Sequence, residues 1–175
     1  MLTFQPRWHP LNELGSLAVT GFRPLAQVWR YVKTVLGVVF RHPLVGVTMI
    51  PVMPDGRLVL VRRRDNGLWS LPGGLVDWGD TIASTIHREL AEETGLTIVA
   101  VGRLVGVYSA FDRDPRIHAV NISVEVQVTG AIAPVDQLEI AEVGLFAPSS
   151  IGGMLLAHDH ARQVQDYFRG QAVVD

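Results

Sequence analysis

Apolar residues recur every three or four positions in three stretches of the chain, and this period predicts amphipathic helices. The first stretch lies between Pro24 and Pro43, which bracket it. The second covers about residues 81–94, and the third covers residues 154–168. We therefore expect one helix near the start of the chain, one near its middle and one near its end.

The other patterned segments are short runs rich in β-branched residues, which are typical of strands. Asp55-Gly56 separates two of these runs and predicts a hairpin turn. Because hairpins dominate and one helix lies mid-sequence, the pattern favours an α+β fold, with a mixed, partly antiparallel sheet and helices packed on its faces. The expected strands are residues 44–53, 58–64, 68–74, 97–111, 118–130 and 142–148.

The 175 residues suffice for one domain with a short extension. We expect an extension at residues 1–42, containing the first helix, and a domain at residues 43–175. The apolar stripe of this helix favours packing on the domain or on a second copy of the chain, so a homodimer is one expectation. Docking on a membrane surface is the alternative, because residues 29–33 combine Trp, Tyr, Arg and Lys.

Charge and cysteine content narrow the class of protein further. The 15 Lys and Arg residues against 17 Asp and Glu residues leave a net charge of −2, which predicts no general attraction to nucleic acid. The chain has no cysteine, which excludes disulfides, thiolate nucleophiles and Cys-based zinc sites. Residues 1–10 do not resemble a secretory signal, and charged residues interrupt the first helix too early for a membrane span. We therefore expect a cytoplasmic protein.

Three acidic residues, Glu89, Glu92 and Glu93, follow Arg88 within the second expected helix. On a helix they share an arc of about 100° on one face. Carboxylates this close stay ionised only if a cation neutralises them, and otherwise their pKa values rise. Oxygen ligands of this kind suit Mg²⁺ or Mn²⁺, whereas Ca²⁺ is disfavoured because the chain has no acidic calcium-binding loop. The cluster therefore predicts a divalent metal site.

The spacing around this cluster resembles the Nudix box of the Nudix hydrolases, GX5EX7REUXEEXGU with U apolar. Gly74 begins the match, Asp80 follows after five residues, and residues 88–96, RELAEETGL, complete it after seven more. Asp80 is a departure, because the family has glutamate at this position. The likeness extends over roughly residues 43–170 and implies the Nudix fold, an α/β/α sandwich.

The resemblance also implies roles for individual residues of the box. The carbonyl oxygen of Gly74 and the carboxylates of Glu89, Glu92 and Glu93 correspond to the metal ligands of the family. Arg88 has a guanidinium that can hold one of these carboxylates in a metal-ready rotamer without touching the substrate.

The implied reaction is metal-assisted attack of water on a phosphorus atom, which cleaves a pyrophosphate bond. The family divides the role of general base between the residue matching Glu89 and an acid in a later loop. Glu139 fits the later position best and Glu142 is the alternative, although either can equally be a surface acid.

Candidate substrate contacts lie outside the box. Arg62 and Arg64 share a strand face and can bind phosphates, although a solvated strand end fits them equally well. Trp69 can stack on a base or pack in the core. Arg113 and Arg116 belong to the segment DRDPR, which is similar to a stretch in bacterial ADP-ribose pyrophosphatases of the family.

Together these features predict a Mg²⁺-dependent Nudix hydrolase that cleaves a nucleoside diphosphate linked to another group. ADP-ribose is the favoured substrate and would give AMP and ribose 5-phosphate. Two alternatives remain, a pyrophosphatase acting on (d)NTPs and a catalytically silent sensor that binds ADP-ribose or a nucleotide. The three retained carboxylates of the box speak against the sensor.

Overall fold

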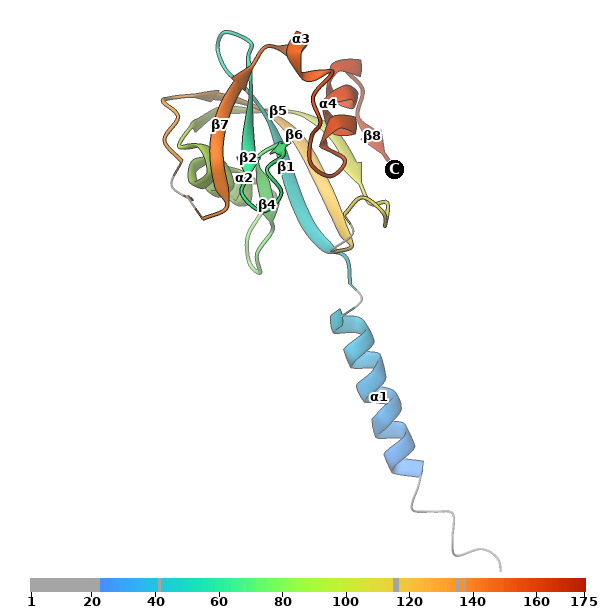
Figure 1. Ribbon diagram of the computed structural model, residues 1–175. Helices are drawn as coiled ribbons and strands as arrows, with labels where there is room; N and C mark the ends of the chain where they lie inside the picture. Colours follow the sequence, from blue (N-terminus) through green and yellow to red (C-terminus); the bar gives the residue numbers. More distant parts are fainter. Residues whose placement is uncertain (1–22, 41, 115–116, 135, 137) are drawn as a thin grey trace, which may run out of the picture. The chain divides into compact units, whose positions relative to one another are not determined.

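The chain separates into two units, one ending at His42 and the other running from Pro43 to Asp175. Helix α1, Arg23–Phe40, belongs to the first unit and confirms the helix expected between the two prolines. A computed structural model describes residues 23–40, 42–114, 117–134, 136 and 138–175 (Figure 1).

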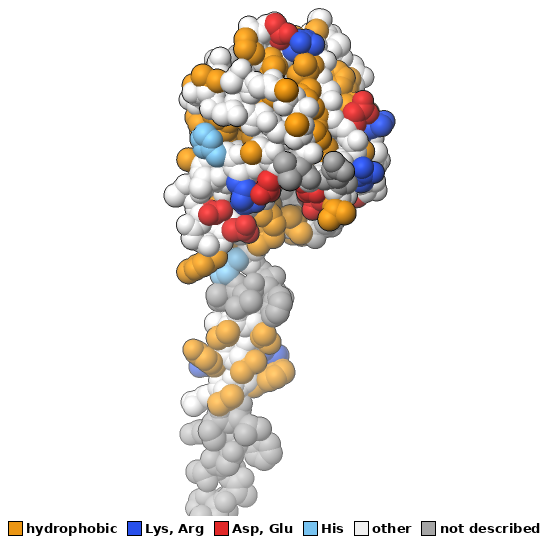
Figure 2. Space-filling model, turned by 90° about the vertical axis from the view of Figure 1, so that its left-hand side faces the viewer, with side chains coloured by type: hydrophobic (Ala, Val, Ile, Leu, Met, Phe, Trp, Pro, Cys, Tyr) orange, Lys and Arg blue, Asp and Glu red, His pale blue; other side chains and the backbone are white. Residues whose placement is uncertain are grey.

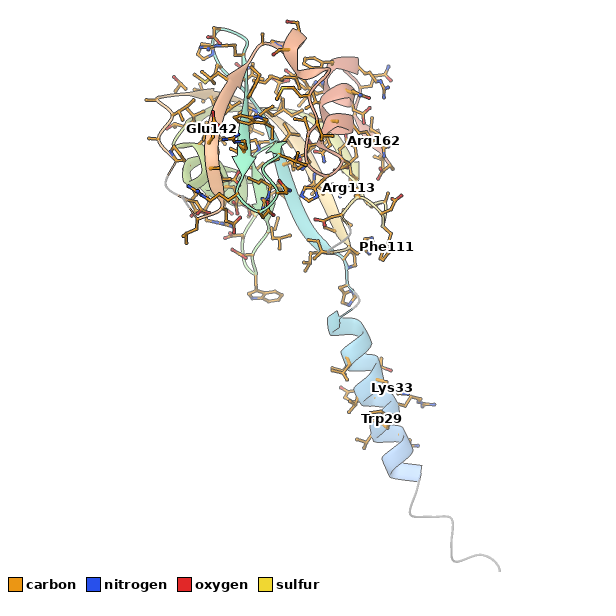
Figure 3. The ribbon with its side chains drawn as sticks, viewed as in Figure 1. Trp29, Lys33, Phe111, Arg113, Glu142 and Arg162 are labelled. Carbon is orange, nitrogen blue, oxygen red and sulfur yellow. The ribbon has the colours of Figure 1, made fainter. Side chains whose placement is uncertain are left out.

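Helix α1 carries exposed aromatic and aliphatic side chains. Trp29 is 60% exposed and Tyr31 is 72% exposed. The ammonium group of Lys33 lies 5.4 Å from the ring centroid of Trp29, and Figure 3 shows the two residues close together on α1. Within the described parts of the chain, no helix is long and apolar enough to cross a membrane.

The second unit is built on a mixed sheet, which confirms the expected fold class. Its strands are β1 Leu44–Val52, β2 Leu58–Arg63, β3 Trp69–Ser70, β4 Gly73–Leu75, β5 Thr97–Tyr108, β6 Ala119–Thr129, β7 Ile140–Phe146 and β8 Val173–Val174. The main order is β3-β2-β1-β6-β5-β8, with β4 paired to β1 and β7 paired to β2. The pairs β1–β6 and β5–β8 are parallel and the remaining pairs are antiparallel. The hairpin expected at Asp55-Gly56 joins β1 to β2.

Helices cover both faces of this sheet (Figure 1). Helix α2, Ile82–Thr94, packs on one face, and helices α3, Pro148–Ile151, and α4, His160–Arg169, pack on the other. Because side chains alternate along a strand, β2 contributes to two separate cores. Val59 belongs to the core beneath α2, whereas Leu58 and Leu60 belong to the core beneath α3 and α4.

The last long helix is shorter than the sequence predicts, because α4 begins at His160 and not at residue 154. Leu156 instead forms a β-bridge with Trp69, and the Ala157 N–H donates to the Trp69 carbonyl at 2.8 Å. His158 then takes a left-handed conformation with φ of 52°, which a continuing helix cannot include. Pairing with β3 thus overrides the helical period of this segment.

Candidate active site

The helix that carries the acidic cluster begins at a capping box. The Thr81 hydroxyl accepts a hydrogen bond from the Ser84 N–H at 3.0 Å, and the Thr81 N–H donates to the Ser84 hydroxyl at 2.8 Å. Ile86 and Leu90 are buried in the core beneath α2. The capping box fixes where α2 begins, and the apolar stripe fixes which of its faces points away from the sheet.

Glu93 is buried at the base of this cluster, with 5% of its surface exposed. Its Oε2 accepts a hydrogen bond from the Gly73 N–H at 2.9 Å. Burial raises the pKa of Glu93 to about 8, and the neighbouring Glu89 carboxylate adds to the rise. A nearby cation would stabilise the ionised form of this buried carboxyl.

Glu89 is also mostly buried, with 14% of its side chain exposed. Its Oε1 accepts a hydrogen bond from the Arg88 Nη1 at 2.7 Å. Burial raises the pKa of Glu89, and the charge of Arg88 opposes that rise. A Cβ atom at position 74 would lie 2.3 Å from Oε1, so only glycine leaves room for this carboxylate.

Arg88 joins several acids of the box. Besides its bond to Glu89, its Nη2 donates to Asp77 at 3.2 Å. Its guanidinium nitrogens lie 3.6 Å from Asp80 and 3.7 Å from Glu92, beyond ordinary hydrogen-bond length. Asp80, which stands where the family has glutamate, therefore contacts Arg88 only as a longer ion pair.

These carboxylates offer the hard oxygen donors that Mg²⁺ and Mn²⁺ prefer. Among the described residues, no three His, Asp or Glu side chains are gathered closely enough to hold an ion as they stand. Glu89 is bound to Arg88 and Glu93 to the Gly73 N–H. Burial is the main cause of the raised pKa values of both carboxyls, and a divalent cation would stabilise their ionised forms.

The acids line a cavity of about 630 Å³. Figure 2 shows acidic and basic side chains gathered in the lower half of the face that it presents. The residues from the box that line the cavity are Gly74, Arg88, Glu89, Glu92 and Glu93. The cavity wall also includes Arg63, Glu139, Asn121, Arg113 and His160 from other elements.

The two later acids differ in position. Glu139 lines the cavity, lies 3.8 Å from the Arg63 Nη2, and its charge helps to raise the pKa of Glu89. Glu142 lies on β7 and pairs with Arg62 at 2.9 Å, outside the residues that line the cavity. In Figure 3, Glu142 and Arg113 lie on different sides of β1. Only Glu139 thus shares the cavity with the box.

Arg62, Arg64 and Trp69, the candidate substrate contacts near the end of β2, are not among the residues that line the cavity. Arg62 points to the same face of β2 as Leu58 and Leu60, where its guanidinium lies 5.9 Å from the Trp69 ring. Trp69 packs edge to face on Phe146, with the ring centroids 4.8 Å apart, against the core beneath α3 and α4.

Arg63 lines the cavity instead, because it shares the strand face of Val59 beneath α2. The strand period alone could have raised this possibility, but it does not say which face of β2 meets the acidic helix.

Arg113 reaches the cavity wall with its guanidinium already engaged. Its Nε and Nη2 donate to the two carboxylate oxygens of Asp159 at 2.6 and 3.0 Å. Its Nη1 donates to the carbonyls of Tyr108 and Ala119 at 3.0 and 3.3 Å. All three guanidinium nitrogens of Arg113 thus donate hydrogen bonds to groups of the protein itself. Arg116 lies outside the described residues.

The cavity also contains residues that sequence reasoning missed. His160 is buried, its Nδ1 accepts from the Leu71 N–H at 3.0 Å, and burial lowers its pKa to about 3. It is therefore a neutral imidazole at neutral pH. Asn121 lies on β6, and the pairing of β6 with β1 brings it to the site. No local sequence pattern predicts this pairing.

Comparison with known proteins shows which family the chain resembles. The NUDIX domain family matches residues 42–168. An ADP-ribose pyrophosphatase from Methanocaldococcus jannaschii is 37% identical over 133 residues, which cover 74% of this chain and 76% of that protein.

Solved structures share the fold. The NUDIX domain of Shewanella oneidensis NrtR, complexed with ADP-ribose, has a TM-score of 0.68 at 21% identity, covering 81% of this chain and 97% of that one. A MutT NUDIX hydrolase from Burkholderia pseudomallei has a TM-score of 0.61 at 26% identity, covering 71% and 98% of the two chains. The expected Nudix fold is thus confirmed, and the match of the family over most of the sequence means that this chain belongs to the Nudix family and is a Nudix hydrolase.

Proposed function

We propose that this Nudix hydrolase cleaves the pyrophosphate bond of a nucleoside diphosphate linked to another group, with ADP-ribose as the favoured substrate. The products would be AMP and ribose 5-phosphate. The observation that carries the proposal is the wall of the cavity, where Glu89, Glu93 and Glu139 lie together beside Arg63. The cavity volume of about 630 Å³ lies within the range of nucleotide-sized ligand sites. The likeness to an ADP-ribose pyrophosphatase supports the choice of substrate.

Nudix hydrolases generally use divalent metal ions. Here Mg²⁺ or Mn²⁺ would be held by Glu89, Glu92, Glu93 and the carbonyl oxygen of Gly74. When bound, such an ion polarises phosphate oxygens and makes water more acidic. Glu89 and Glu93 present mostly buried carboxylates, whereas the Glu92 side chain is 49% exposed, and the absence of a Cβ atom at Gly74 leaves room for the Glu89 carboxylate.

The chain's own residues would supply orientation and proton transfer. Arg88 binds Glu89 and would keep its carboxylate from turning away from the cavity. Glu139 would accept the proton of the attacking water, because it is an exposed carboxylate on the cavity wall with 63% of its side chain accessible. Arg63 donates from Nε and Nη2 to Asp65 at 3.0 and 3.2 Å and lies 3.8 Å from Glu139, and its guanidinium would bind a phosphate oxygen when the substrate enters.

The proposal is tested by product analysis with purified protein and Mg²⁺ across ADP-ribose, NADH, dinucleoside polyphosphates and (d)NTPs. We expect ADP-ribose to give the highest kcat/KM, with AMP and ribose 5-phosphate as products. Higher kcat/KM for a (d)NTP would replace this substrate class with that of a nucleotide-pool pyrophosphatase. Tight ADP-ribose binding without hydrolysis of any compound would instead indicate a sensor.

We also propose that residues 43–175 form the catalytic domain and that α1 mediates a homodimer. The exposed apolar residues of α1, including Val28, Trp29 and Leu36, support a contact with a second copy. Light scattering should give twice the mass of the 19.2 kDa chain. A monomeric mass at micromolar concentration would refute the dimer without affecting the enzymatic proposal.

A further inference from the structure

A series of buried and part-buried hydrogen bonds runs from Arg113 to the wall of the active-site cavity. It starts with the Arg113 guanidinium, which donates to both carboxylate oxygens of Asp159. Arginine has no acceptor, so Asp159 must accept at both oxygens. The charge at this end therefore decides the direction of every later bond in the series.

Each following residue can therefore form its hydrogen bond in only one donor-to-acceptor direction. Gln163 is fully buried and donates from Nε2 to Asp159 Oδ1 at 3.0 Å, so its Oε1 must accept. Thr48 donates its only hydroxyl proton to this Oε1 at 2.6 Å. The Thr48 oxygen can then only accept, and it accepts from Asn121 Nδ2 at 2.8 Å. The amide of Asn121 is thereby fixed with Nδ2 toward Thr48 and Oδ1 away from it.

The Asn121 Oδ1 lies beside Gly46 in the cavity wall. Gly46 pairs with Asn121 across the parallel strands β1 and β6, and all three residues Gly46, Thr48 and Asn121 line the cavity. A Cβ atom at position 46 would lie 3.3 Å from Asn121 Oδ1 and 3.5 Å from the carbonyl oxygen of Gly74. The oriented amide oxygen is thus next to the start of the box.

We propose that Asn121 Oδ1 is a specificity-determining acceptor for a hydroxyl of one of the two riboses that flank the diphosphate. The inference rests on the proposed function, because the diphosphate must lie near Gly74 and the acids of the box. An acceptor so close to Gly74 is within reach of a sugar attached to the diphosphate, whereas the amino group of the base lies farther along the nucleotide. Thr48 and Gln163 act as positioning residues, since they fix the direction of the amide without being its terminal acceptor.

The experiment compares kcat/KM for ADP-ribose with analogues that each lack one donor. Deoxy analogues remove a hydroxyl from either ribose, and the inosine analogue replaces the amino group of the base. We expect one deoxy analogue to lose roughly ten- to hundredfold in kcat/KM with the wild-type protein. With Asn121→Leu, which has the same branched side-chain shape but no acceptor, this discrimination should shrink to within roughly threefold, because the two losses are coupled.

A second variant keeps the inference testable if Asn121→Leu does not fold. Thr48→Val removes the hydroxyl that holds Nδ2, so it should reduce the same discrimination in part, and Thr48→Ser should restore it. Ser123→Ala is the matched control on β6, because its hydroxyl is buried without a hydrogen-bond partner and does not line the cavity. It should leave the discrimination unchanged.

Three results would overturn the inference. These are equal use of all deoxy analogues by the wild-type protein, unchanged discrimination in Asn121→Leu, and an effect of Asn121→Leu confined to the inosine analogue. Each of them presupposes hydrolysis of ADP-ribose, so the proposed function survives them. Absence of hydrolysis of every nucleoside diphosphate sugar by the wild-type protein would instead overturn the proposed function and this inference together.

Discussion

The Glu89 carboxylate lies so close to Gly74 that a Cβ atom at position 74 would come within 2.3 Å of Glu89 Oε1. Gly74→Ala should therefore displace this carboxylate and lower kcat by roughly a hundredfold, because small misplacements at a reacting centre are costly. Gly152→Ala is the control, since Gly152 has φ of −59° and no heavy atom within 4 Å of the added Cβ position. Equal activity of the two variants would contradict a catalytic position for Glu89.

Arg88 is expected to act through Glu89. Arg88→Lys keeps the positive charge but loses the donor fork that binds Glu89 at 2.7 Å. We expect affinity for Mn²⁺ to fall by roughly ten- to hundredfold, as measured by calorimetry. Arg57→Lys provides the comparison, because Arg57 is half exposed and pairs with Asp55 at the hairpin turn. An Arg88→Lys protein that binds Mn²⁺ as tightly as Arg57→Lys would argue against this positioning role.

The acidic cluster could be predicted from sequence because its geometry is local. Helix periodicity brings Glu89, Glu92 and Glu93 to one face, and the residues of the box lie within one short segment that ends at the capped helix. Arg88 lies next to Glu89 in the sequence, and the contact between the two side chains is equally local.

Other parts of the cavity could not be predicted, because they depend on contacts between distant segments. The choice of Arg63 over Arg62 depends on which face of β2 meets α2. The bond between Asn121 and Thr48 joins residues 73 positions apart in the sequence. The contacts of Trp69 with Phe146 on β7 and of Arg113 with Asp159, the residue before α4, also join segments that lie far apart in the sequence.

Glu93 should make the stability of the metal-free protein depend on pH. Burial holds its pKa at about 8, above the value of about 4.3 in an unfolded chain, so between these values the folded state keeps a proton that the unfolded state releases. The stabilising contribution is fully present below about pH 4 and is lost as the pH rises toward 8. Urea unfolding with a chelator should show a decrease on the order of a few kcal/mol across this window.

Glu93→Gln should flatten this pH dependence, because the amide does not titrate. Glu92→Gln should leave it in place, since the Glu92 side chain is 49% exposed. A slope that is the same in both variants would show that other groups are responsible.

Glu139 and Glu142 form a matched pair for the general base. Glu139→Gln should lower kcat by roughly a hundredfold or more, because it removes the carboxylate that accepts the proton of the attacking water. Glu142→Gln should remain within roughly threefold of the wild-type protein, because Glu142 pairs with Arg62 outside the cavity. A larger effect at Glu142 would exchange the two assignments.

The most direct test of the account is calorimetric titration of Mg²⁺ or Mn²⁺ into the protein bound to a non-hydrolysable ADP-ribose analogue, with the analogue alone as a reference. We expect uptake of metal by the wild-type complex and at least roughly tenfold weaker uptake with Glu89→Gln or Glu92→Gln. Absence of metal uptake by the wild-type complex, or equal uptake by the variants, would contradict the claim that these carboxylates hold the ion on the diphosphate.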